Sequence, residues 1–195
     1  PNELARNLYR NRTGIVGVMV PDLDHPFFSC LAKHIEMELY RQGYKTMICN
    51  TIGISDREKD YLDMLDRNIV DGIITAAHSL DEEEYLKRKK PIVSVDREFG
   101  PGIPLIGSDH AMGGRMAAEL LLKNGCRKVL QISGVAPGVA AQERHSVFKE
   151  VMQKQGVEIL NMVMDWNVFD WNAHYTGMEK FLEEHPDIDG VFGGD

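Results

Sequence analysis

Carboxylates, an arginine and several aromatic rings follow the apolar segments of this 195-residue chain. Asp22 and Asp96 come directly after runs rich in Val and Ile, and Arg144 lies in a helical pattern that follows another such run. A carboxylate accepts hydrogen bonds from two hydroxyl groups, and a guanidinium offers a rigid array of donors, so together they suit a polyol. Aromatic rings stack on the apolar face of a sugar or a purine. The candidate ligand-binding residues are Asp22, Phe27, Phe28, Asp96, Arg144, Phe169, Trp171 and Asp195.

Common catalytic and metal-binding motifs are absent from the sequence. It contains no G-x-x-x-x-G-K-[ST] phosphate loop, no C-x-x-C or H-E-x-x-H zinc spacing, and no G-x-S-x-G nucleophile turn. Asp22-x-Asp24-His25 combines carboxylates with an imidazole, but the simpler interpretation is a polar turn between a strand and a helix. We therefore expect no catalytic residue, no metal site, no cofactor and no enzymatic activity.

Short buried strands that alternate with helices must position these side chains. Runs of Val and Ile that lack the alternate polar residues of a half-exposed strand cover residues 15–20, 46–49, 73–76, 92–95, 129–132, 159–163 and 191–192. Helical patterns fill the intervals, over residues 26–41, 55–68, 81–89, 109–123, 140–155 and 172–184. Ser55-x-x-Glu58 has the spacing of a helix capping box, and Gly43 is placed to end the first helix.

This alternation predicts an α/β fold with parallel sheets that carry helices on both faces. Glycine and proline concentrate at residues 100–104, which divides the chain into a first lobe at 14–107 and a second lobe at 108–195. Parallel sheets bind ligands outside the carboxyl ends of their strands, and two lobes would bring such ends together in one cleft. The candidate residues lie at or just after these ends, so we expect the site there.

The composition argues against some classes of function. A hydrophobic content of 43% supports a packed core, whereas a net charge of −8 argues against direct binding of nucleic acid, which needs clustered Lys and Arg. No apolar run is long enough for a membrane span, and no export leader precedes the first strand. The three cysteines are far apart, which favours reduced thiols and a cytoplasmic location.

Several motifs occur together and in the order found in one protein family. They are L-A-R-N-L at 4–8, V-P-D-L-D-H-P-F-F at 20–28, V-D-G-I-I at 70–74, P-I-V-S-V-D-R at 91–97, D-H-A-M-G-G at 109–114, R-H-S-V-F at 144–148 and H-P-D-I-D-G-V-F at 185–192. Over nearly the whole chain, these motifs resemble the regulatory half of bacterial LacI-family transcription regulators. The sequence departs from the family pattern at His110, where the family has Asn, and at Val147 and His174, where it has Gly.

The resemblance implies a periplasmic-binding-protein type I-like architecture whose second lobe is incomplete in this sequence. It also implies a small-molecule effector, a sugar or sugar derivative, bound between the lobes. Asp96 and Arg144 match family positions that contact effector hydroxyls or carboxylates, and Phe27 and Phe28 match the loop that lines the pocket. Phe169 matches the family's stacking aromatic, and Trp171, two residues further on, is kept as a second candidate for that role. Asp195 takes the family's Asn position.

The resemblance further implies a homodimer that controls operator DNA through a helix-turn-helix head that would precede this sequence. Residues 1–13 then correspond to the end of a hinge helix and a linker, and Leu8 matches the leucine that enters the minor groove. Two other functions stay open. A sugar-binding receptor of a transport system would share the fold, and a doubly wound enzyme would use Asp22, Asp24 and Asp96 as acid–base or metal carboxylates.

Overall fold

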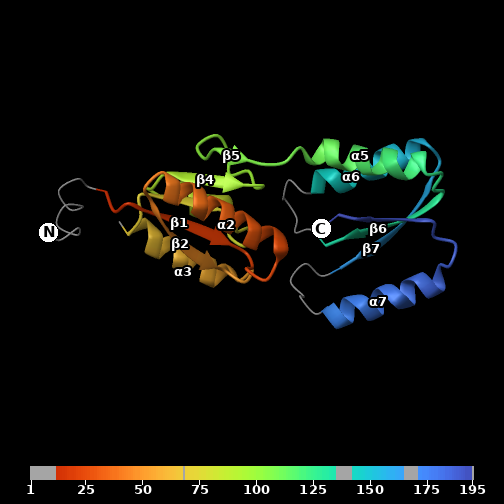
Figure 1. Cartoon of the computed structure of the whole chain (residues 1–195), viewed down its shortest axis with the longest axis horizontal. Helices are drawn as coiled ribbons and strands as arrows, with labels where there is room; N and C mark the ends of the chain where they lie inside the picture. The colour runs from red at the N-terminus through yellow and green to blue at the C-terminus, as the bar shows by residue number, and fades with distance from the viewer. Residues whose placement is uncertain (1–11, 68, 135–141, 165–170, 195) are drawn as a thin grey trace. The chain divides into compact units, whose positions relative to one another are not determined.

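The computed structural model describes residues 12–67, 69–134, 142–164 and 171–194 (Figure 1). The chain divides between Gly107 and Ser108 into two compact units, which we call unit 1 and unit 2. Strands pair in parallel within each unit, and no described strand of one unit joins the sheet of the other. The predicted α/β class, with parallel sheets flanked by helices, is confirmed.

Unit 1 alternates strands and helices around one sheet. Its elements are β1 (Ile15–Val20), α2 (Pro26–Arg41), β2 (Lys45–Asn50), α3 (Ser55–Asp66), β3 (Gly72–Thr75), α4 (Glu82–Leu86), β4 (Ile92–Val95) and β5 (Leu105–Ile106). The strands lie in the order β2-β1-β3-β4-β5, with Val16 opposite both Thr46 and Gly72. β1 therefore lies between β2 and β3, and the loops after β1, β2, β3 and β4 leave from one end of the parallel strands.

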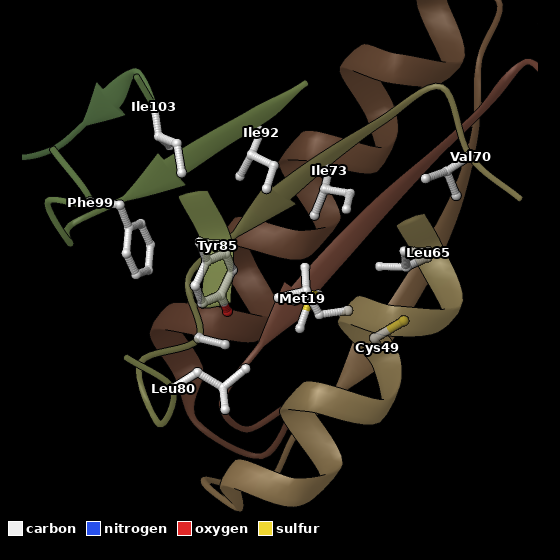
Figure 2. Close-up of a cluster of buried hydrophobic side chains, with 12 residues drawn as sticks. Met19, Cys49, Leu65, Val70, Ile73, Leu80, Tyr85, Ile92, Phe99 and Ile103 are labelled. Atoms are coloured by element: carbon white, nitrogen blue, oxygen red, sulfur yellow. The ribbon is translucent and has the colours of Figure 1, made fainter. Parts of the chain in front are cut away.

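Strand β1 is buried on both of its faces, which explains its continuous apolar run in the sequence. Val18 and Val20 of β1 face α2 and pack with Ala32. The intervening Met19 faces α3 and α4, where it joins the cluster that contains Leu62 and Tyr85 (Figure 2). Successive side chains of a strand point to opposite faces, so each residue of β1 serves one of two cores.

Unit 2 repeats this architecture in a smaller form. Its elements are α5 (His110–Lys123), β6 (Lys128–Ser133), α6 (Gln142–Lys154), β7 (Glu158–Val163), α7 (Trp171–Glu184) and β8 (Gly190–Gly193). The described strands lie in the order β7-β6-β8, which corresponds to β2-β1-β3 of unit 1. Helices α5 and α6 cover one face of this sheet, where Phe148 and Met152 of α6 share a core with Val129 of β6. Helix α7 lies on the other face (Figure 1).

The two units also share a local device that we call the Asp–Gly clamp, formed by Asp71-Gly72 in unit 1 and Asp189-Gly190 in unit 2. The Asp71 amide donates to the Ile15 carbonyl at 2.8 Å, while its carboxylate accepts from the amides of Thr13 and Gly14 at 2.7 and 2.9 Å. The Asp189 amide and carboxylate bind the start of β6 in the same way, at residues 127–128. The clamp of unit 1 thus ties β3 to the start of β1, and the clamp of unit 2 ties β8 to the start of β6.

Replacing Asp71 with asparagine should lower the free energy of unfolding at pH 7 by about 1–2 kcal/mol, the scale of charge-assisted hydrogen bonds. Partial burial opposes ionisation of Asp71, but the hydrogen bonds from Thr13 and Gly14 outweigh it and hold the pKa of the carboxyl below its ordinary value. A depressed pKa stabilises the fold while the group is ionised, so this contribution disappears as the pH falls below about 4.

Urea unfolding at pH 7 and pH 3 checks this expectation, with the exposed Asp60 of α3, replaced by asparagine, as the matched control. The difference between wild type and the Asp71 variant should shrink at the lower pH, whereas Asp60→Asn should match wild type at both. A deficit of equal size at both pH values would show that the charge of Asp71 is not what stabilises unit 1.

Several expected element boundaries are corrected by the structure. Ser55 is not a helix cap: it is the first residue of α3, Ile54 holds the cap position without a side-chain hydrogen bond, and Glu58 turns into the core. Helix α4 ends at Leu86 rather than residue 89. The Arg88 side chain is only 8% exposed because it pairs with Asp63 and Glu84.

One short strand was not expected from the sequence. The short strand β5 carries no long apolar run and was not predicted. Within the described part of the chain, no helix is both long and apolar enough to cross a membrane.

Candidate functional site

Asp22 and Asp96 lie at the carboxyl edge of the unit 1 sheet, in the segments that follow β1 and β4. Both side chains are half-buried. Asp22 Oδ1 accepts a hydrogen bond from the amide of Asp24 at 3.0 Å, which folds this segment into a tight polar turn. Asp22-x-Asp24-His25 is therefore a strand-to-helix turn. Among the described residues, no group of three or more His, Cys, Asp or Glu side chains is arranged to hold a metal ion.

The same turn sets the start of α2 and the position of the two phenylalanines. His25 caps the helix through its Nδ1, which accepts from the amide of Phe27 at 3.2 Å, and Pro26 fits the first turn because no donor is needed there. Phe28 packs against the Val18 cluster. Phe27 remains 46% exposed and meets Phe28 edge to face at 5.1 Å, so Phe27 offers the accessible ring.

Backbone strain is concentrated at this edge. Among the described non-glycine residues, Ile52 and Asp96 have positive φ values of 48° and 55°. They follow β2 and β4 respectively. This conformation is costly for a β-branched residue such as Ile52, and strained residues tend to gather where a protein binds ligands. The backbone geometry therefore points to the same edge as the carboxylates.

Unsatisfied polar atoms also gather there. Asn50 ends β2, and Ser79 and Arg97 follow β3 and β4. Each has a buried polar atom with no hydrogen-bond partner in the described part of the chain: Asn50 Oδ1, Ser79 Oγ and Arg97 Nη1. Buried polar groups are normally paired, and such exceptions occur where water or a ligand completes the set.

His78 lies beside Ser79 in the loop after β3 and was not identified from the sequence. Burial lowers the pKa of its imidazole below the ordinary value, and a hydrogen bond to the Ala76 carbonyl and the nearby Glu58 carboxylate only partly offset this. The ring is therefore neutral at pH 7, where it can both donate and accept. The signal that singled out Asp96, a polar residue directly after a buried strand, applied equally to His78 and Ser79.

In unit 2, Arg144 lies in the first described turn of α6, near the carboxyl end of β6. Gly114 of α5 sets this position, because any Cβ at residue 114 would overlap the Arg144 carbonyl oxygen. The neighbouring His145 is buried, with its Nδ1 3.1 Å from Gln131 Nε2. A groove of about 660 Å³ opens between α6 and β7, with Gln131, His145 and Asn161 among its lining residues.

The other candidate residues lie wholly or partly outside the described part of the chain. Leu8, Phe169 and Asp195 lie outside the described residues. Trp171 begins α7, and its side chain is likewise outside the description. The structure thus brings Asp22, Phe27, Phe28 and Asp96 to the edge of the unit 1 sheet, and it places Arg144 at the corresponding end of unit 2.

Comparisons with known proteins agree with this architecture. Residues 13–195 match the family described as periplasmic binding proteins and sugar binding domain of LacI family. The ribose operon repressor of Halalkalibacterium halodurans is 35% identical over 192 residues, which are 98% of this chain and 57% of that protein. The sucrose operon repressor of Streptococcus mutans serotype c is 45% identical over 134 residues, 69% of this chain and 42% of that protein.

Solved structures show the same relationship. A periplasmic binding protein/LacI transcriptional regulator from Alkaliphilus metalliredigens QYMF, complexed with D-xylulofuranose, superposes with a TM-score of 0.81 at 32% identity, covering 92% of this chain and 66% of that one. The chain spans about half the length of the curated relatives it matches. Because the family match covers residues 13–195, the chain belongs to the family of periplasmic binding proteins and LacI-type sugar-binding domains.

Proposed function

We propose that this chain is the effector-binding core of a LacI-type transcription regulator and that its effector is a sugar or sugar derivative. The observation that carries the proposal is the collection of polar groups at the carboxyl edge of the unit 1 sheet in a chain of this family. Half-buried carboxylates and a neutral imidazole provide acceptors and donors for sugar hydroxyls. An enzyme would instead arrange such groups around the bond that reacts.

Specific roles follow for the residues at this edge. Asp22 and Asp96 accept hydrogen bonds from hydroxyl groups, and His78 contributes a donor and an acceptor from the loop after β3. Phe27 supplies an accessible ring for stacking. Arg144 contributes charge-assisted donors from unit 2. Phe169 and Asp195 complete the proposed set because they match family positions, and Trp171 is the second candidate for the stacking ring. We assign no catalytic role to any of them.

The DNA-binding part of the proposal concerns the whole protein. Most of the relatives named above are operon repressors, so we propose that operator DNA is bound in the cytoplasm by a helix-turn-helix segment joined to this chain, with Leu8 in the hinge. We also propose a homodimer. Met37 and Tyr40 on α2 and Ile48 on the edge strand β2 are apolar side chains that are 43–62% exposed, as expected for a surface that a second copy covers.

Calorimetric titration of the chain with D-ribose, sucrose, D-xylulose and D-fructose 1-phosphate tests the sugar proposal. We expect at least one sugar to bind and, at a hundredfold excess over its Kd, to stabilise the fold by about 2.7 kcal/mol, which raises the melting temperature by about 5–10 °C. L-Ribose is the control, because its mirror-image hydroxyls cannot meet the same donors and acceptors. Failure of every sugar to bind at 10 mM, a concentration about ten thousandfold above a micromolar Kd, would contradict the proposal.

A further inference from the structure

The loop after β3, residues 76–80, is held in place by side chains from distant elements. The Ser79 amide donates to Glu58 Oε2 of α3 at 2.8 Å, across 21 positions of sequence. At the next residue, the Leu80 carbonyl accepts from Arg97 Nη2 at 2.6 Å. The backbone on both sides of the Ser79 side chain is therefore fixed from outside the loop, by groups that come from α3 and from the segment after β4.

A buried hydrogen-bond network supports this arrangement. Glu58 is fully buried, and its second oxygen, Oε1, accepts from the Tyr85 hydroxyl at 2.5 Å. The Tyr85 hydroxyl also lies 3.3 Å from Thr75 Oγ1, which in turn accepts from the Ala77 amide at 3.2 Å. Burial and the nearby Glu58 carboxylate raise the pKa of Tyr85, so its hydroxyl keeps the proton that it donates.

Aromatic stacking closes the network on its other side. Tyr85 stacks on Phe99 with ring centroids 4.2 Å apart, and the two rings lie together in the core (Figure 2). The guanidinium of Arg97 lies over the ring of Phe99, at 4.7 Å from the ring centroid. The group that holds Leu80 is thus linked through two aromatic rings to the group that holds Ser79.

Burial of this network contributes little net stability to the core. A buried carboxylate loses its hydration, and well-packed apolar side chains of similar volume are often as stable or more stable in such places. An apolar side chain at position 58 would fill the space, but it would not accept the Ser79 amide. The specific consequence of Glu58 is therefore the position of the 76–80 loop rather than the stability of the core.

We infer that Glu58 is a positioning residue for effector selection: it fixes the 76–80 loop and so determines where His78 and Ser79 meet the ligand. This inference rests on the proposed function. In this role Glu58 acts through the loop, in cooperation with Tyr85 and Arg97.

The test compares Glu58→Gln and the double variant Glu58→Met/Tyr85→Phe with wild type, and Asp60→Asn on the same helix is the control. The double variant replaces both partners of the short hydrogen bond with apolar groups, so neither of the two is left buried without the other. Three quantities are measured: hydrogen exchange of the Ser79 amide by NMR, the Kd for D-ribose and sucrose, and the urea midpoint.

We expect Ser79 exchange to quicken at least tenfold and the Kd to rise about tenfold in the double variant, while its urea midpoint stays near that of wild type. Glu58→Gln should change both quantities less, because its side-chain oxygen can still accept from the Ser79 amide. A residue with a merely structural role would move the midpoint together with the Kd. Ser79 exchange that matches wild type, or a Kd within twofold of it, would overturn the inference. If wild type binds neither sugar, the proposed function fails separately, and Ser79 exchange alone decides whether Glu58 positions the loop.

Discussion

Replacing Gly114 with alanine should destabilise unit 2 by about 2–4 kcal/mol, a large effect for the addition of one methyl group. A Cβ at this position would overlap the Arg144 carbonyl oxygen and lie 2.9 Å from its carbonyl carbon. These are backbone atoms of α6, which cannot rotate away as a side chain would, so α5 and α6 would have to separate. The Phe148 and Met152 core beneath them would then lose contacts.

The adjacent Gly113 provides a matched control within the same helix. A Cβ at Gly113 would meet nothing within 4 Å, and the residue is exposed. Because alanine is the better helix former, Gly113→Ala should be neutral or stabilise the chain by about 0.5–1 kcal/mol. Urea unfolding followed by circular dichroism measures both. Equal midpoints for the two variants would show that the α5–α6 contact is looser than the structure indicates.

Replacing Arg144 with alanine should weaken sugar binding about a hundredfold or more. The proposed role of Arg144 is to donate charge-assisted hydrogen bonds to the effector, each of which contributes about 1.5–3 kcal/mol. The loss of two such bonds corresponds to at least two factors of ten in Kd, since each factor of ten equals 1.4 kcal/mol. Calorimetric titration with the sugars used above gives the Kd directly.

Arg115, an exposed arginine on α5, is the matched control and should bind sugar like wild type when replaced with alanine. In a longer protein that carries a DNA-binding head, Arg144→Ala should leave operator affinity near normal, because an effector acts only through its preference for one conformation. An unchanged Kd would remove Arg144 from the site. Lost operator binding with an unfolded circular dichroism spectrum would show instead that Arg144 is structural.

The elements of the fold were predictable because their signals are local. Helix α2 has the expected bounds, since Pro26 opens it and Gly43, with a φ of +86°, follows its end. Glu58 shows where local signals fail. Its spacing from Ser55 is that of a capping box, but its partners, Tyr85 and Ser79, are 27 and 21 positions away. No pattern within one helix contains that information, so the sequence predicted a capping role for a carboxylate that is buried in the core.

The candidate site was predictable to the same extent. Asp22 and Asp96 could be placed at a sheet edge because each directly follows a recognisable strand. Asn50, Ser79 and Arg97 were missed as site residues, although they stand at equivalent places, because their distinguishing property is a buried atom without a partner. That property depends on the packing of several elements together, and it appears only once the neighbouring loops are in position.

The Asp–Gly clamps have a consequence for how each sheet assembles. A central strand that is apolar on both faces carries no pattern to distinguish its correct alignment from one shifted by a residue, and β1 is such a strand. The amide and carboxylate of Asp71 recognise polar backbone groups at residues 13–15, and Asp189 recognises those at residues 127–128. A shifted strand would break all of these bonds at once. The clamps therefore fix the register in which β1 and β6 pair with their neighbours, which their apolar side chains alone do not specify.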